Sequence, residues 1–241
     1  FDLCDQNGIM VWQDFAMGCT TYPQDPEFAD QIRKEAISIV LKLRKHPSLV
    51  LWSGNNENDV SLAWYLQKRI DPGLDVISRV VLPRVIWEYD PVRDYLPSSP
   101  YLSEEYFKQG CDDKLLPEVH LWGPRGYYKA TFYTDVDAHF VSEIGYHGCP
   151  NRKSLERMFS PESVYPWSDG WNWNNDWKTK AVRPHPELTK YDFRNNLMLK
   201  QIDALFGERP KDLDQFIFAS QVVQAEAMKF FIELWRMDKF R

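Results

Sequence analysis

The sequence predicts an α/β fold in which parallel strands alternate with helices. Short apolar runs typical of buried strands recur along the chain, and stretches with helical periodicity lie between them. The runs cover residues 9–12, 49–52, 92–96, 118–122 and 138–142. Strands joined by helical crossovers run parallel and place the helices outside the sheet. Because a closed barrel of this class has eight strands, these five predict part of a TIM (β/α)8 barrel.

The first two helices have recognisable ends. Residues 1–7 read as a helical stretch that stops at Gly8, since glycine adopts the left-handed conformation favoured just after a helix. The second helix starts strongly, because Asp25 can cap it and Pro26 suits its first position. Apolar residues at helical spacing continue to about Lys45, and the next strand follows.

Further helices are predicted over residues 76–89 and 213–235, from the same periodicity. The segment between residues 160 and 186 is irregular and too long for a passive connection, so we expect it to shape a pocket rim. Its four tryptophans are Trp167, Trp171, Trp173 and Trp177. They form an aromatic wall in that interpretation, or they only fasten a long loop.

Composition excludes several kinds of protein. The net charge is −6 and the sequence pI about 5.4, whereas nucleic-acid binders usually carry a clustered basic patch, so no nucleic acid is expected. No apolar run approaches the roughly 18 residues that span a bilayer, so no membrane association is expected. The first residues show no targeting segment.

Cysteine and histidine spacing gives no metal signature. The four cysteines lack a Cys-x-x-Cys motif and are interpreted as structural or free thiols. The histidines have no ligand-like spacing with them, so neither a catalytic metal nor another cofactor is expected.

Two glutamates carry most of the functional information. Glu57 and Glu143 each follow a short apolar run closely. In a barrel of parallel strands, the C-terminal strand ends meet at one mouth. Two carboxyl groups in one pocket are the machinery of glycoside hydrolysis, because one must be protonated to assist the leaving oxygen while the other is ionised.

Five further residues are candidates for substrate binding, each with a structural alternative. Asn56 either contacts the sugar or is a turn residue after a strand. His120 and Trp122 alternate on one strand, so they face the pocket together or pack in the core. Asp14 binds substrate or caps a loop, and Trp64 lines the pocket or packs inward from a helix.

Three stretches resemble glycoside hydrolase family 2, most closely its β-mannosidase branch. They are residues 1–15, ending GIMVWQDF, residues 44–58, RKHPSLVLWSGNNEN, and residues 140–145, FVSEIG. The resemblance implies strands three, four and seven of the barrel, and weaker matches at residues 94–100 and 119–122 imply strands five and six. The whole of residues 1–241 is then an incomplete catalytic barrel, whose first two strands and last strand lie outside the chain, beside flanking β-sandwich domains.

The resemblance also implies the chemistry. It assigns a retaining, exo-acting β-glycosidase, most closely a β-mannosidase, with Glu57 as acid/base and Glu143 as nucleophile. It implies that the Asn56 amide contacts the sugar hydroxyl beside the reacting carbon, that the partner is an oligosaccharide or glycoside, and that a secreted or periplasmic location is plausible.

Substrate alternatives stay open. Ile144 replaces a commoner phenylalanine, and residues 146–149, YHGC, depart from the usual mannosidase continuation. A β-galactosidase or exo-β-glucosaminidase of the same family fits as well, as does a non-catalytic carbohydrate-binding member.

Overall fold

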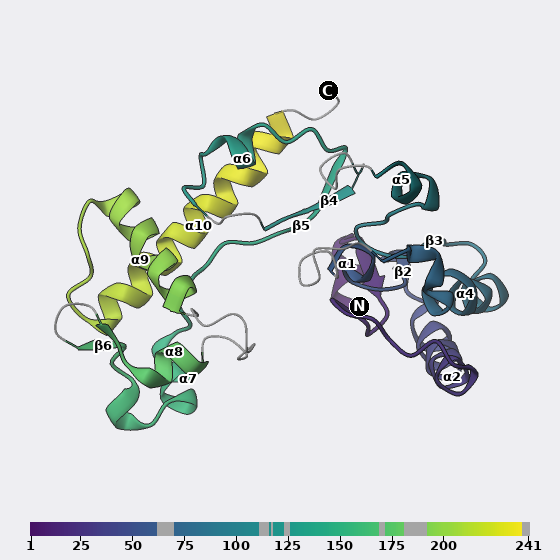
Figure 1. Ribbon diagram of the computed structural model, residues 1–241, viewed down its shortest axis with the longest axis horizontal. Coiled ribbons are helices and arrows are strands. Elements are labelled where there is room, and N and C mark those ends of the chain that lie inside the picture. The colour runs from purple at the N-terminus through teal and green to yellow at the C-terminus, as the bar shows by residue number, and fades with distance from the viewer. Residues whose placement is uncertain are drawn as a thin grey trace. The chain divides into compact units, whose positions relative to one another are not determined.

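The computed structural model describes residues 1–61, 70–110, 116, 118–122, 126–168, 172–180 and 192–237. These fall into two compact units (Figure 1). The first unit comprises Phe1–His120 and Asp137–Glu143, and the second comprises Leu121–Val136 and Ile144–Arg241. Among the described helices, none has both the length and the apolar composition needed to cross a membrane.

The first unit alternates strands and helices along the chain. Its elements are α1 (Asp2–Asn7), β1 (Val11–Asp14), α2 (Pro26–Leu43), β2 (Leu49–Ser53), the 3₁₀ turn η1 (Pro72–Leu74), the π-helical turn η2 (Ile77–Val81), α4 (Leu82–Tyr89), β3 (Asp94–Leu96) and α5 (Glu104–Gln109). β4 (Glu118–Leu121) and β5 (Phe140–Ile144) also lie in it, except for their last residues.

Strands β1, β2 and β3 form a parallel sheet in that order, which confirms the predicted strand–helix–strand arrangement. The register places Gln13 opposite Trp52 and Trp52 opposite Tyr95. Strands β4 and β5 form a separate two-stranded sheet. Helices α2 and α4 contact each other. The described strands of this unit therefore establish an α/β fold in two small sheets and do not by themselves close a barrel.

Helix ends follow the predicted signals. Gly8 ends α1 in the left-handed conformation, with φ 66°. The Asp25 carboxylate accepts a hydrogen bond from the Phe28 amide at 3.0 Å, which caps α2 as expected. The boundary of β1 differs from the prediction. The Ile9 amide donates to the Cys4 carbonyl within α1, so pairing starts only at Val11, whose amide donates to the carbonyl of Ser48 just before β2.

The core of the first unit surrounds Trp52, which is fully buried. Its indole N–H donates to the Asp90 carboxylate at 2.8 Å, and Arg93 pairs with the same carboxylate at 2.9 Å. The Arg93 guanidinium also donates to the carbonyl groups of His46, which precedes β2, and of Leu49, which begins it. This buried network fixes the start of the central strand, because each charged group has a partner.

The second unit is mainly helical. Its elements are α6 (Thr131–Thr134), α7 (Arg152–Met158), the 3₁₀ turn η4 (Pro161–Ser163), β6 (Trp167–Ser168), β7 (Asn172–Trp173), α8 (Asn175–Lys180), α9 (Asp192–Phe206) and α10 (Leu213–Met237). Strands β6 and β7 pair antiparallel.

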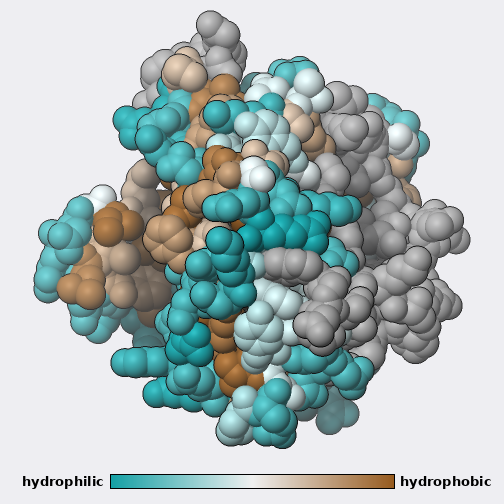
Figure 2. All heavy atoms as spheres, turned by 90° about the vertical axis from the view of Figure 1, so that its left-hand side faces the viewer, coloured by the Kyte–Doolittle hydropathy of each residue, from teal (hydrophilic) through white to brown (hydrophobic). Residues whose placement is uncertain are grey.

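Figure 2 shows one face of the molecule, on which apolar side chains interrupt a largely polar surface.

The tryptophans of the irregular segment are core residues. Trp167, Trp173 and Trp177 are each less than a tenth exposed, and their rings lie 5.4 to 6.3 Å from that of Phe216 on α10. They fasten this long segment to the helix, so the aromatic-wall interpretation is wrong for these three residues. Trp171 lies outside the described residues.

Candidate active site

The segments that follow β1, β2 and β3 are joined by backbone hydrogen bonds. The Asn56 amide donates to the Met17 carbonyl at 2.9 Å, and the Cys19 amide returns to the Asn56 carbonyl at 2.8 Å. On the other side, the Glu57 amide donates to the Ser99 carbonyl at 2.7 Å. Residue 57 is therefore held between its two neighbours at the C-terminal edge of a parallel sheet, where ligand sites of α/β folds are found.

Glu57 has an uncommon backbone conformation. Its φ of 64° lies in the left-handed region, which non-glycine residues adopt rarely and which costs free energy. Asn55 holds the turn that enforces it. The Asn55 amide group donates to the Ser78 hydroxyl at 2.8 Å, and its carbonyl oxygen accepts from the Ser98 hydroxyl at 2.7 Å and the Asn58 amide at 3.1 Å. This buried network compensates the strain at Glu57.

His120 on β4 lies between the two candidate carboxylates. Its Nδ1 is 2.8 Å from Oε1 of Glu57 and 3.3 Å from Oε2 of Glu143. The nearest carboxylate oxygens of Glu57 and Glu143 lie within 4.8 Å of one another. Glu57 and His120 have side chains that are 7% and 5% exposed, whereas that of Glu143 is 34% exposed. The site therefore brings both predicted glutamates together, with Glu143 accessible from solvent.

Glu143 lies within a strand rather than after one. β5 runs over Phe140–Ile144, two residues later than the predicted run of residues 138–142. The side chain of Ser142, the residue before it, donates to the Glu118 carboxylate of β4, so contacts with the partner strand set this boundary. Ser142 and Glu143 both reach side chains of β4, since Ser142 contacts Glu118 and Glu143 contacts His120.

The hydrogen bonds around His120 determine its protonation. The Ser99 hydroxyl donates its single hydrogen to the Glu118 carboxylate at 2.6 Å, so it accepts from Nε2–H of His120 at 3.0 Å. Nδ1 faces two carboxylates, Glu57 and Glu143, which accept hydrogen bonds when ionised. Both ring nitrogens then carry hydrogen, and the imidazole is a cation.

The pKa values agree with this assignment. Burial alone lowers the pKa of His120, but the neighbouring Glu118 carboxylate, the hydrogen bond to Glu57 and the charge of Glu143 outweigh burial and raise it to about 9. Burial likewise raises the pKa of Glu118, yet the neighbouring His120 cation and the hydrogen bonds from Ser142 and Ser99 prevail and lower it. The site thus contains an imidazolium and a carboxylate that stabilise each other.

Cys19 is a contact that sequence reasoning missed. Its thiol donates to Oε2 of Glu57 at 3.1 Å, and its own φ of 55° is left-handed. Burial, then the hydrogen bond to Glu57, raises the pKa of this thiol to about 11, so it stays protonated at neutral pH. The Asn56 amide group lies 3.6 Å from the sulfur. The sequence contains no signal that predicts this contact, because it depends on the left-handed backbone conformations of Cys19 and Glu57, neither of which is a glycine.

Asp14 and Trp122 occupy defined positions. The Asp14 carboxylate accepts from the Trp12 indole at 2.9 Å, and burial raises the pKa of Asp14. Trp122 directly follows β4 and belongs to the second unit, where its ring occupies the space that a Cβ atom on Gly145 would fill. Trp64 lies outside the described residues.

Glu118 was also missed, although the sequence holds a signal for it. It precedes His120 by two positions on β4, and alternate residues of a strand share a face. A charged residue at the start of a short strand usually reads as solvent-exposed, whereas this side chain is only 13% exposed.

Two clusters among the described residues have potential metal-ligand atoms within 4.8 Å. In the cluster of Glu57, His120 and Glu143, both ring nitrogens carry hydrogen and offer no lone pair. The other consists of Asp2, Asp5 and His46. There His46 Nδ1 lies 2.6 Å from the Asp5 carboxylate, and this pair joins α1 to the turn before β2. The absence of a catalytic metal stays a prediction.

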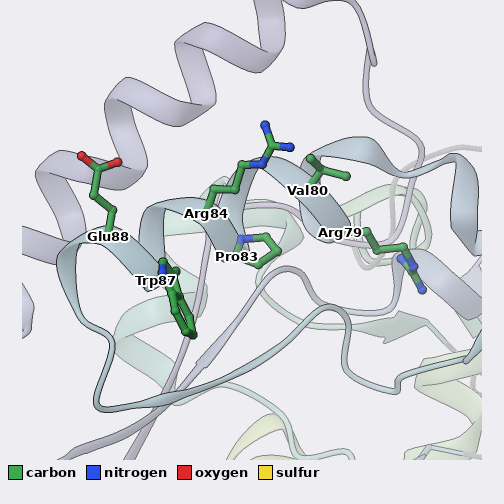
Figure 3. Close-up of a pocket in the computed structure, with 6 residues that line it drawn as sticks. All are labelled: Arg79, Val80, Pro83, Arg84, Trp87 and Glu88. Atoms are coloured by element: carbon green, nitrogen blue, oxygen red, sulfur yellow. The ribbon is translucent and has the colours of Figure 1, made fainter.

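A groove on the outside of the first unit is separate from this cluster. It is lined by Arg79, Val80, Pro83, Arg84, Trp87 and Glu88, all from η2 and α4 (Figure 3). Trp87 is 80% exposed there, while the Arg79 guanidinium pairs with buried Asp59 at 2.7 Å. None of the groove residues belongs to the carboxylate cluster.

Comparison with known proteins identifies relatives along the whole chain. A beta-mannosidase from Bos taurus is 31% identical over 267 aligned positions, which cover 99% of this chain and 27% of the relative. Beta-mannosidase B from Aspergillus fumigatus is 30% identical over 254 positions, covering 98% of this chain and 28% of the relative. No family model matches the sequence.

A solved structure gives the same result. The crystal structure of beta-D-mannosidase from Dictyoglomus thermophilum superposes with a TM-score of 0.77 at 29% identity, covering 99% of this chain and 27% of that protein. The chain thus spans about a quarter of the length of the relatives that it matches. The resemblance inferred from the sequence is confirmed: this chain has an α/β fold and is homologous along its length to the beta-mannosidases.

Proposed function

We propose that this chain carries the catalytic centre of a retaining, exo-acting β-glycosidase that hydrolyses terminal β-mannosides. One observation supports the mechanism most directly, namely that carboxylate oxygens of Glu57 and Glu143 lie within 4.8 Å of one another. Retaining enzymes place their two carboxyl groups about 5–5.5 Å apart, whereas inverting enzymes need about 6.5–9.5 Å to admit a water molecule. The mannoside specificity rests on the names of the relatives.

In the first step, the Glu143 carboxylate attacks the anomeric carbon of the substrate. Glu57 gives its proton to the glycosidic oxygen as the carbon–oxygen bond breaks, so the aglycone leaves as an alcohol. A covalent ester then joins the sugar to Glu143. Solvent exposure of the Glu143 side chain, at 34%, suits a nucleophile that a sugar must reach.

In the second step, Glu57 is ionised and acts as the base. It takes a proton from water while the water oxygen attacks the anomeric carbon, and the ester to Glu143 breaks. Two inversions give net retention. His120 contacts both carboxylates, so its positive charge stabilises the anion on Glu57 after the first step and on Glu143 after the second.

Other residues complete the proposed pocket. Asn56, which precedes the acid/base, contacts the hydroxyl beside the reacting carbon. Asp14 at the end of β1, Trp122 after β4, and Trp64 extend the pocket toward the rest of the sugar. In this proposal the strands described here are strands three to seven of a TIM (β/α)8 barrel within a single catalytic domain, and flanking β-sandwich domains are its covalent partners.

The test is the stereochemistry and residue dependence of hydrolysis. We would assay the full chain against 4-nitrophenyl β-mannoside, β-galactoside, β-glucoside and N-acetyl-β-glucosaminide, and follow the anomer released by NMR. The β-mannoside should be preferred, and the first product should be the β-anomer. Glu143→Gln should lower kcat by on the order of 10⁴ or more, while the exposed control Glu226→Gln should retain activity.

Each result has a definite meaning. An α-anomer as the first product contradicts the retaining mechanism. Full activity of Glu143→Gln contradicts the assignment of the nucleophile. Tight sugar binding by wild type and Glu143→Gln alike, without turnover by either, would favour a carbohydrate-binding function instead.

A further inference from the structure

Glu118 is a buried charged residue that the proposed chemical steps do not use. Its Oε1 accepts hydrogen bonds from the hydroxyls of Ser99, at 2.6 Å, and Ser142. The same oxygen lies 3.6 Å from Nε2 of His120. Glu118 therefore lies behind the imidazole, on the side opposite the two candidate catalytic carboxylates, which contact Nδ1.

His120 is surrounded by acidic groups from four strands or their ends. These are Glu118 on its own strand β4, Glu57 after β2, Glu143 on β5, and Asp14 at the end of β1, whose pKa the charge of His120 lowers against the larger effect of burial. A neutral imidazole has only one N–H, so it cannot donate to Ser99 and to the carboxylates at the same time. While Glu57 and Glu143 are both ionised, only the doubly protonated ring satisfies both sides.

We infer that Glu118 is a positioning residue that acts through Ser99 and His120. It keeps the imidazole doubly protonated and aimed, through Nδ1, at both catalytic carboxylates. The catalytic part of this inference rests on the proposed function, whereas the part that concerns the protonation of His120 does not.

The contacts of Glu118 are directed at the surroundings of His120. Its Oε1 accepts from two hydroxyls and lies 3.6 Å from the imidazole, whereas its Oε2 is buried and has no hydrogen-bond partner among the described residues. Its removal should therefore alter the charge of His120 rather than the fit of the sugar. Loss of the cation leaves Glu57 and Glu143 close together without a positive charge between them, which disfavours every state in which both are ionised.

The experiment is a histidine titration in the full chain labelled with ¹⁵N-histidine. The ring nitrogens report the protonation state directly, and His120→Gln assigns the signal. In wild type, the His120 signal should remain that of an imidazolium up to about pH 9. In Glu118→Gln, which keeps the shape but loses the charge, deprotonation should occur at least one pH unit lower.

Kinetics supply the second readout. For Glu118→Gln, kcat at pH 8 should fall by roughly tenfold or more with little change in KM, since an electrostatic contribution is lost and no sugar contact changes. Glu118→Asp, which restores the charge, should recover part of both properties. Glu226→Gln on α10 is the matched control and should leave the titration and kcat unchanged.

An unchanged His120 titration in Glu118→Gln overturns the inference. If Glu118→Gln does not fold, as judged by the other histidine signals, Ser99→Ala replaces it. That variant removes the hydroxyl between Glu118 and His120, so His120 should lose its proton at a lower pH than in wild type. An unchanged deprotonation pH of His120 in Ser99→Ala would also overturn the inference. A chain without glycosidase activity whose His120 titration still depends on Glu118 refutes the proposed function but leaves the link between Glu118 and His120 intact.

Discussion

Nδ1 of His120 lies 2.8 Å from Oε1 of Glu57, and the two side chains are among the most buried polar groups of the site. A charged donor at this distance forms one of the stronger hydrogen bonds found in proteins. The orientation of the proposed acid/base is thus coupled to the protonation of a histidine on a strand that is distant in sequence. Several measurable consequences arise from this coupling and from the turns that surround it.

The first prediction concerns the leaving group. Glu57→Ala should lower kcat/KM for a poor leaving group, such as an alkyl alcohol, by roughly 10²–10⁴ because no acid protonates the departing oxygen. For 2,4-dinitrophenyl glycosides, which need no protonation, the first step should be nearly unaffected. Glycosyl-enzyme should then accumulate, and azide should restore turnover by replacing the water that Glu57 activates.

The control for this prediction is Glu143→Ala, which should lose activity on both kinds of leaving group equally. An equal loss in Glu57→Ala on both substrates would mean that Glu57 is not the acid.

The second prediction concerns Cys19. Its thiol donates a hydrogen bond to the Glu57 carboxylate at 3.1 Å. Cys19→Ala removes this donor and should lower kcat by roughly 2- to 10-fold, since one such hydrogen bond contributes about 0.5–1.5 kcal/mol. Cys19→Ser, which keeps a donor, should remain near wild type. Equal kcat values for Cys19→Ala and wild type would show that the thiol has no influence on the acid/base.

The third prediction links His120 to stability. The pKa of His120 is raised to about 9 in the folded chain, and the unfolded value is near 6.5. The folded state binds more protons between these values, so the free energy of unfolding should decrease as pH rises from about 6.5 to 9. The contribution of this residue is on the order of 3 kcal/mol, fully present below pH 6.5.

Urea unfolding at pH 6, 7.5 and 9 measures this effect, with His120→Gln as the comparison. In the variant, the free energy of unfolding should change less with pH across this window. At the acidic end, the lowered pKa of Glu118 should contribute stability that is lost as pH falls below about 4.5. Parallel curves for wild type and His120→Gln between pH 6.5 and 9 would contradict the assignment of the cation.

The fourth prediction tests the turn after β2. A Cβ atom on Gly54 would overlap the Pro97 carbonyl oxygen and the Tyr95 hydroxyl. Gly54→Ala should therefore lower the free energy of unfolding by about 1–3 kcal/mol, as overpacking does. Gly126→Ala is the control, because no atom lies within 4 Å of its added Cβ. Equal stability of the two variants would contradict the described approach of the segments after β2 and β3.

Much of the fold was predictable because its signals are local. Gly8 and Asp25 act within one turn of the helices that they terminate, so the chain around them suffices to locate those ends. The parallel order of β1, β2 and β3 followed from alternation with helices. The boundary of β5 was wrong, since pairing with β4 and not local apolarity decides which residues extend.

The site was predictable only in part. Glu57 and Glu143 lie near the C-terminal ends of strands, and these ends meet at one mouth of a barrel. The role of Glu118 depends on Ser99, which follows β3, and on Ser142 in β5, and the approach of Cys19 to Glu57 joins residues 38 positions apart. Such pairings are set by the relative placement of segments, which no local pattern encodes.

The left-handed backbone of Glu57 has a consequence for the evolution of such chains. Its φ of 64° suits glycine or asparagine better than glutamate, with a difference of roughly 1–2 kcal/mol for a residue with an ordinary side chain. Replacement by glycine would remove the carboxyl group and relax the turn at once. Selection for heat resistance alone would therefore tend to discard this residue, and only continuous selection for turnover would retain it.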